Sequence, residues 1–258
     1  MSHKILVMSP LHNMGATVVS TLIAQGVTFD SKTSTLIFTQ PRSKLPEYLG
    51  IGNNNDPTRS VMQIVKLIDN GAIEDKDILD YAYDYSKNAY LLDVADPSLS
   101  GRDREQVVSH IFNRAPTDIV VCDNSEDIDT PVSQRLLDIA DMIFIVIDMS
   151  RKSREYMQAW LETPQLSKLT NVYFIVNNYN EVVYAIRNYA KTIHQPANRV
   201  CKMHYNPWIE KCCNNSQLAT LLPAARQLDP RVASLNTDIA EIVQCINGDM
   251  IFKIKKGV

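Results

Sequence analysis

The amino-acid sequence predicts an α/β fold with three layers, in which a mostly parallel, twisted sheet carries helices on both faces. Two observations lead to this prediction. Short, continuous apolar runs recur along the chain, as in strands that are buried on both faces. Longer amphipathic stretches with recognisable ends alternate with these runs, and such alternation is typical of doubly wound sheets.

Six apolar runs are the predicted strands. They lack the alternation of a half-exposed strand, so each is expected to lie inside the sheet. In chain order they are Ile5–Met8, Thr35–Phe38, Ala89–Leu92, Ile119–Cys122, Met142–Ile147 and Val172–Val176.

The predicted helices follow from their start and stop signals. The last one is expected to end before Gly248, and the alternating apolar and basic residues after it predict an extended edge segment rather than a membrane helix. The helices and this segment are Ala16 to about Ala24 with Gly26 as its stop, Asp56-Pro57 to Gly71, about Arg104 to Asn113, Thr130-Pro131 to about Ala140, Asn236–Asp238 to Gly248, and the segment Met250–Lys256.

Length and composition narrow the class of protein. The chain has 258 residues, of which 45% are hydrophobic, enough for one sizeable core, and we predict a single domain over residues 1–258. No apolar run approaches the ~20 residues that span a bilayer. The five cysteines lack C-x-x-C spacing, which predicts free thiols and a reducing, cytoplasmic location.

Charge is distributed unevenly. The formal net charge of −3 argues against general nucleic-acid binding by the whole chain. Asp69–Glu105 is mainly acidic, whereas Arg151–Lys202 holds eight basic and three acidic residues. These stretches are either solvated faces of opposite sign, or the basic one meets phosphate groups or an acidic partner.

The loop after the first predicted strand has the frame of a phosphate-binding loop. A strand, a loop, a small residue, a threonine and a helix follow one another, as in G-x-x-x-x-G-K-[ST]. Gly15 and Thr17 match the second glycine and the hydroxyl residue of this pattern. Pro10 takes the first glycine position and Ala16 the lysine position.

The segment KILVMSPLHNMGATVVSTLIAQG, residues 4–26, resembles the opening of the MinD/ParA group of P-loop ATPases, whose deviant Walker A motif reads roughly SPKGGVGKTTV. In this alignment Leu11 falls on the signature lysine and Ala16 on the P-loop lysine. His12 and Asn13 fall on the paired glycines.

Further landmarks of the same group follow in order, so that the resemblance covers about residues 3–180. Leu36–Ile51 resembles LLIDLDPQGNLSDYLG, with Phe38 and Gln40 at the two motif aspartates. Thr117–Asp127 resembles the Walker B region, with Asp123 at the Mg-associated aspartate. Ile139–Ser153 resembles the strand that follows it in this group. Val172–Asn180 resembles the strand that ends in a base-contacting Asn, here Asn177 or Asn178.

The resemblance implies ATP or ADP with Mg²⁺ as cofactor. It assigns Gly15, Thr17 and Asn178 to the nucleotide and Thr17 and Asp123 to the metal. The other members of the acidic cluster, Glu126, Asp127 and Asp129, are expected to belong to a surface loop.

The departures from the motif predict that this cofactor binds weakly or not at all. Glycines let backbone N–H groups converge on phosphate oxygens, and lysines neutralise them, but this loop has one glycine and no lysine. Phosphoryl transfer depends on such charge neutralisation, so we expect no catalytic residues and no ATP hydrolysis.

The resulting prediction is a degenerate, non-hydrolysing MinD/ParA-like protein. It would act as a scaffold, localisation or assembly partner of a bacterial pilus or secretion-type machine, as in the CpaE/TadZ-like branch, and pair with itself or with a related ATPase. The alternative is an ATP-dependent, ParA-like partition protein that binds DNA through Arg151–Lys202.

Overall fold

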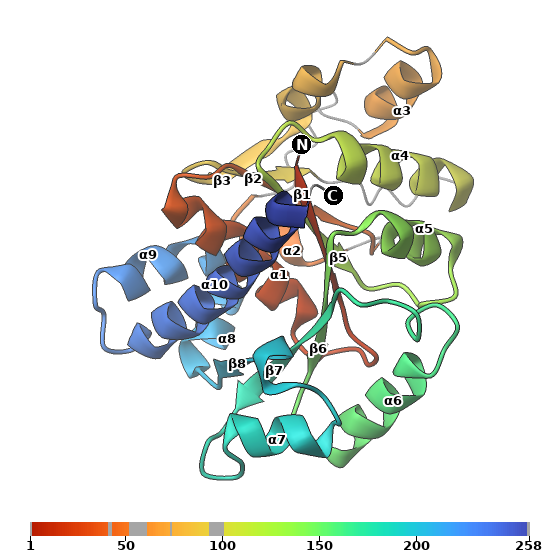
Figure 1. Cartoon of the computed structure of the whole chain (residues 1–258). Coiled ribbons are helices and arrows are strands. Elements are labelled where there is room, and N and C mark those ends of the chain that lie inside the picture. Colours follow the sequence, from red (N-terminus) through yellow and green to blue (C-terminus); the bar gives the residue numbers. More distant parts are fainter. Residues whose placement is uncertain (1, 41–42, 52–60, 73, 93–100, 257–258) are drawn as a thin grey trace.

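The computed structural model describes residues 2–40, 43–51, 61–72, 74–92 and 101–256. Its centre is an eight-stranded sheet in the order β3-β4-β2-β5-β1-β6-β7-β8 (Figure 1). All neighbouring strands are parallel except β3 and β4. The strands are β1 His3–Met8, β2 Ser34–Phe38, β3 Tyr83–Ser86, β4 Ala89–Leu92, β5 Ile119–Asn124, β6 Met142–Ile147, β7 Val172–Tyr179 and β8 Val200–His204.

Helices cover both faces of this sheet and enclose one hydrophobic cluster on each side. The three predicted layers are therefore confirmed. One face carries α1 Ala16–Val27, α2 Leu45–Tyr48, α8 Pro207–Asn214, α9 Leu221–Arg226 and α10 Ala233–Lys256, and the other carries α3 Val61–Asp69, α4 Gly101–Arg114, α5 Pro131–Ile139, α6 Arg151–Leu161 and α7 Ile186–Thr192. Short 3₁₀ turns occupy Thr28–Asp30, Asp75–Tyr81, Ala197–Arg199 and Leu218–Thr220.

The six predicted strands are all present, with bounds that differ by at most a few residues. Every residue of β2, β5 and β6 is buried. Helices on both faces remove both sides of these strands from water, which explains why their sequences are continuous apolar runs.

Two further strands escaped the sequence analysis because they lie at the edges of the sheet. β3 has no fully buried residue and β8 has two, Val200 and Met203. Edge strands of this kind carry polar residues and lack the apolar run by which the other strands were found.

The predicted helix ends are confirmed where side chains cap them. The hydroxyl of Thr130 accepts a 3.2 Å hydrogen bond from the backbone N–H of Ser133 at the start of α5. α3 ends at Asp69, just before Gly71, whereas its predicted start at Asp56-Pro57 lies outside the described residues.

Gly26 does not stop the first helix as predicted, because α1 continues to Val27. A Cβ at Gly26 would lie 2.4 Å from Cγ2 of Ile239 in α10. The residue lacks a side chain because α1 and α10 approach each other closely at this point.

The predictions for the C-terminal segment were wrong. α10 begins at Ala233, earlier than Asn236, and runs through Gly248 to Lys256, so that Met250–Lys256 is helical rather than extended. A glycine inside a helix costs only about 1 kcal/mol, which the burial of Ile242 and Ile246 offsets. Across the described ranges, the structure contains no helix with the length and apolar character needed to traverse a bilayer.

Candidate functional site

A pocket of about 700 Å³ lies at the carboxyl ends of β1, β2 and β5, where ligands bind in open α/β sheets. The first loop and the start of α1 form most of its wall, and segments that follow β2 and β5 complete it. Its lining residues are Ser9, Leu11, His12, Asn13, Met14, Gly15, Ala16, Thr17, Val18, Gln40, Ser43, Lys44, Tyr48, Asn124 and Ser125.

The first loop turns into α1 through two residues with left-handed backbone. Asn13 has φ 64° and Gly15 has φ 84°, and Gly15 caps the helix without a side-chain hydrogen bond. The loop therefore keeps a sharp turn with a single glycine, since Asn tolerates this conformation better than most residues.

Asn177, at the end of β7, closes the loop from the side. Its side-chain Nδ2 donates a 2.7 Å hydrogen bond to the carbonyl oxygen of Met14. A Cβ at Gly15 would lie 2.3 Å from this same nitrogen. The neighbouring Asn178 is exposed and has φ 51°, so Asn177 is the asparagine that contacts the loop.

Asp123 lies buried beside the loop, and the sheet register places it opposite Val7 in β1 and Phe38 in β2. It is 1% exposed. Burial raises the pKa of Asp123 to about 6, although hydrogen bonds from the hydroxyls of Thr17 and Ser125 act in the opposite direction.

The surroundings of Asp123 fit a hard cation. Its Oδ1 is buried and has no hydrogen-bond partner in the part of the chain that the structure describes. A buried carboxylate oxygen without a partner is unfavourable unless a cation compensates it. Thr17 and Asp123 offer hydroxyl and carboxylate oxygens, which are the ligands that Mg²⁺ prefers.

The positive charge of a phosphate-binding loop is missing from the first loop. Leu11 and Ala16 line the pocket at the positions of the two lysines. Among the described residues of the wall, the side chains able to carry positive charge are His12 and Lys44, and both are exposed. Lys44 was not predicted as a site residue, because the segment that Leu36–Ile51 resembles assigns no role to this position.

The two aspartates of the family segment that Leu36–Ile51 resembles are also missing from the pocket. Phe38 is 1% exposed and belongs to the core, whereas Gln40 lies in the wall. The described wall therefore has no carboxylate at these positions to orient an attacking water.

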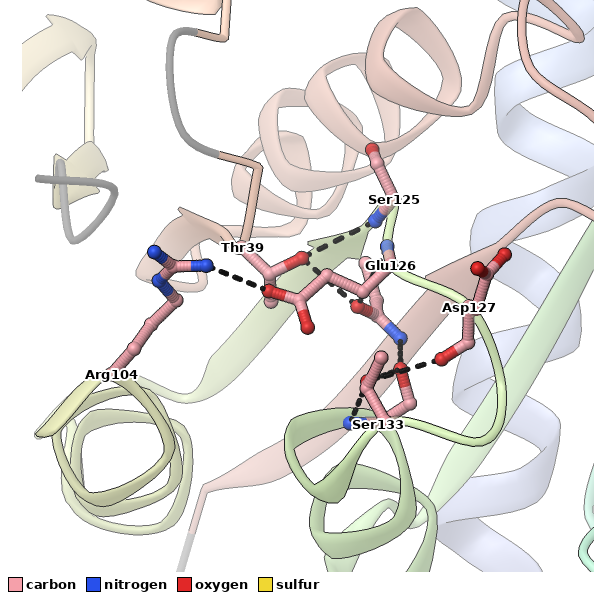
Figure 2. A network of polar contacts seen from close by, with 8 residues as sticks. Thr39, Arg104, Ser125, Glu126, Asp127 and Ser133 are labelled. Atoms are coloured by element: carbon pink, nitrogen blue, oxygen red, sulfur yellow. Dashed lines mark hydrogen bonds and ion pairs between the residues drawn. The ribbon is translucent and has the colours of Figure 1, made fainter. Parts of the chain in front are cut away.

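A polar network fixes the segment after β5 (Figure 2). Thr39 Oγ1 donates a 2.9 Å hydrogen bond to Asn124 Oδ1, and Asn124 Nδ2 donates a 2.8 Å hydrogen bond to Ser133 Oγ. The backbone N–H of Ser125 donates to Thr39 Oγ1 over 3.3 Å. The network holds the end of β5, and with it Asp123, against β2 and α5.

Two other members of the acidic cluster, Glu126 and Asp129, have side-chain partners. Glu126 accepts a 3.4 Å hydrogen bond from Nη1 of Arg104, as Figure 2 shows, and Asp129 accepts one of 3.0 Å from Gln165. Within the described ranges, no group of three or more His, Cys, Asp or Glu residues is arranged to hold a metal ion. The expectation that these acids belong to a surface loop agrees with this placement.

The basic residues of Arg151–Lys202 do not form one continuous stripe. Arg151 lies on α6, which packs on one face of the sheet through Met157, and it pairs with Glu155 over 2.6 Å. Lys202 instead faces Glu241 of α10, on the other face of the sheet, over 4.0 Å.

Neither the family models nor the curated proteins yield a match to this sequence. Solved structures do match over almost the whole chain. A ParA family ATPase from Chlorobium tepidum TLS matches with a TM-score of 0.68 and 14% sequence identity. The match covers 94% of this chain and 99% of the ATPase chain. The septum site-determining protein MinD from Pyrococcus horikoshii OT3, complexed with Mg-ADP, has a TM-score of 0.69 at 13% identity, with 95% and 96% covered.

A third match is the MinC:MinD cell division protein complex of Aquifex aeolicus, with a TM-score of 0.69 at 14% identity and with 95% and 96% covered. These identities are low, and the likeness concerns architecture. The chain therefore has the fold of the MinD and ParA ATPases, a P-loop NTPase fold, as the order of its sequence landmarks implied.

Proposed function

We propose that this protein is a non-hydrolysing relative of the MinD and ParA ATPases that acts by binding other proteins, as a scaffold, localisation or assembly partner. One observation carries the proposal: Leu11 and Ala16 line the pocket where the two lysines would stand. Without these charges, a triphosphate and its transition state lose most of their neutralisation.

The partner is proposed to be another protein. The Aquifex aeolicus structure shows that a protein of this fold is found in complex with a protein partner. We propose a homodimer or a heterodimer with a related ATPase, and, following the resemblance to the CpaE/TadZ-like branch, a bacterial pilus or secretion-type machine as the assembly served.

Titration calorimetry with Mg-ATP and Mg-ADP, together with light scattering in the same buffers, tests this function. The expected result is no heat of nucleotide binding in the micromolar range and a molar mass that does not change with nucleotide. Micromolar affinity with an ATP-dependent shift to a dimer would contradict the proposal and favour a nucleotide-driven switch.

The second candidate function is that of an ATP-dependent partition protein that binds DNA. It is favoured by Thr17 and Asp123, which keep hydroxyl and carboxylate oxygens together at a position that fits Mg²⁺. If Mg-nucleotide binds, Thr17 and Asp123 would hold the metal, which would supply positive charge to offset that of the phosphates. The loop around Gly15 would then face the phosphates.

Two measurements address this second candidate. Asp123→Ala should abolish any Mg²⁺-dependent nucleotide binding, and retention of the Mg²⁺ dependence would refute the metal assignment. DNA binding through the basic side chains of Arg151–Lys202 should weaken steeply with salt concentration. Weak DNA binding that is insensitive to salt would count against the partition function.

A further inference from the structure

One face of α10 lies along the edge strand β8, and two pairs of side chains show which residues of the helix and the strand lie opposite each other. His204 Nδ1 of β8 is 2.9 Å from Oδ1 of Asp238 in α10. Lys202 Nζ is 4.0 Å from Oε1 of Glu241. Strand and helix therefore run past each other in opposite directions, since lower numbers on β8 match higher numbers on α10.

The packing of α10 on the sheet also brings two cysteines together. Cys245 lies on α10 one helical turn after Glu241, and Cys201 of β8 packs with it against the hydrophobic cluster between α10 and the sheet. The two thiols are hydrogen-bonded to each other. Farther along α10, the hydroxyl of Tyr173 in β7 donates a 3.3 Å hydrogen bond to Asp249. The contact of α10 with the sheet therefore continues beyond Cys245.

We propose that Cys201 and Cys245 form a modification site that a hydroperoxide oxidises to a disulfide between β8 and α10. Both residues are partly exposed free cysteines, so a small oxidant can reach them. By contrast, Cys122 and Cys213 are buried.

The hydrogen bond between the thiols also prepares one of them for reaction. It stabilises the thiolate of Cys245 and so lowers the pKa of Cys245, while it raises the pKa of Cys201. The thiolate is the nucleophilic form of cysteine, so Cys245 is the attacking residue.

The reaction runs in two steps. The Cys245 sulfur attacks the hydroperoxide, the O–O bond breaks, and one oxygen stays on sulfur as a sulfenic acid while water or an alcohol leaves. The Cys201 sulfur then attacks the Cys245 sulfur, the S–S bond forms, and the S–O oxygen leaves as water with the Cys201 proton. Two thiols lose two electrons in total, and the hydroperoxide takes them up.

The position of β8 allows the small approach that the bond needs. A disulfide brings its sulfurs to about 2.0 Å, closer than hydrogen-bonded thiols. β8 is the last strand of the sheet, paired on one side by β7, so it can shift toward α10 with less disturbance than an inner strand.

The experiment treats the full chain with hydrogen peroxide, blocks the remaining thiols, and maps tryptic peptides by mass spectrometry with and without dithiothreitol. The expected result is a linked peptide pair with Cys201 and Cys245, two hydrogen atoms lighter than the reduced pair and separated by dithiothreitol. The oxidised protein should also unfold at a temperature about 5 °C or more higher, because the bond closes a long loop.

Two variants and a control sharpen this result. Cys201→Ser should stop at the sulfenic acid of Cys245, which dimedone traps, and Cys245→Ser should give no linked pair. Cys212→Ser, at a partly exposed cysteine of α8, should react like the wild type. Wild-type peptides that gain oxygen on Cys245 without linkage, or a disulfide between two chains, would overturn the proposal.

Discussion

The side-chain amide of Asn177 donates a 2.7 Å hydrogen bond to the carbonyl oxygen of Met14, and so joins the end of β7 to the loop that precedes α1. The contact crosses from one strand end to another and fixes a loop that has only one glycine. Because the adjacent Gly15 has no side chain, the amide reaches the loop without a clash.

Gly15→Ala should destabilise the protein by about 2–4 kcal/mol in urea unfolding. A left-handed backbone costs a non-glycine residue roughly 1–2 kcal/mol, and the new Cβ would also stand 2.3 Å from Asn177 Nδ2. Gly71→Ala is the matched control, because Gly71 has φ 62° with no atom within 4 Å of an added Cβ. Equal losses in the two variants would show that Asn177 does not confine the loop. With Asn177→Ala in the same chain, the cost of Gly15→Ala should fall toward that of the control.

Asp123→Asn should stabilise the protein at about pH 8 in the absence of Mg²⁺. Burial raises the pKa of Asp123 from 3.8 to about 6, so the folded state holds this proton more tightly than the unfolded state. Stability of the wild type therefore increases as the pH falls from above about 6 toward 4, by at most about 3 kcal/mol from this group. The neutral amide has no such dependence, so the two unfolding curves should converge near pH 4.

Urea unfolding between about pH 4 and pH 8 measures the effect of Asp123→Asn. Asp138→Asn, at an exposed carboxylate of α5, controls for the loss of one negative charge. Parallel pH profiles for the wild type and Asp123→Asn would contradict the buried, ionised carboxylate.

Restoring the lost residues of the first loop should restore nucleotide affinity. The combination Leu11→Lys, His12→Gly, Asn13→Gly and Ala16→Lys places two lysines and two glycines where the MinD/ParA motif has them. We expect ATP affinity to increase about tenfold or more in calorimetry, because charge-assisted hydrogen bonds to phosphate are the strong ones.

A variant with Leu11→Gln and Ala16→Gln adds length and polarity without charge, and its affinity should stay near that of the wild type. Unchanged ATP affinity in the restored variant would mean that the pocket is remodelled beyond the loop, for example around Lys44 and Tyr48 in its wall.

Asp238→Ala should reduce the free energy of unfolding by about 3 kcal/mol. Asp238 is 1% exposed and accepts hydrogen bonds from the backbone N–H and the ring Nδ1 of His204, at 2.8 Å and 2.9 Å. Its removal leaves a buried donor without a partner. Glu241→Ala, one turn along α10, should cost at most about 0.5 kcal/mol because its 4.0 Å pair with Lys202 is exposed to water. Similar losses in the two variants would contradict this ranking.

The inner strands and the site loop were predictable because burial on both faces and the P-loop frame leave strong marks in the sequence. Thr17 and Asp123 are hydrogen-bonded to each other, and their joint role in metal binding stays a prediction. The choice between Asn177 and Asn178 was not available from spacing, because neighbouring residues at a strand end can face either way.

Other features depend on tertiary contacts that local sequence does not encode. Gly26 reads as a helix stop, yet its role is set by Ile239, which is distant in sequence. Gly248 was also predicted to end a helix, but α10 continues through it because Ile246 is packed in the core. Lys44 lies in the pocket wall, although the segment that Leu36–Ile51 resembles assigns no role to this position.

The place of β1 in the sheet also has a consequence for folding during synthesis on the ribosome. Its two neighbours are β5, at Ile119–Asn124, and β6, at Met142–Ile147. At a synthesis rate of roughly 5–20 residues per second, Ile5–Met8 waits on the order of ten seconds before both neighbours exist. β1 is therefore made well before its partners, and its apolar side chains, which the folded sheet buries, stay exposed during that time.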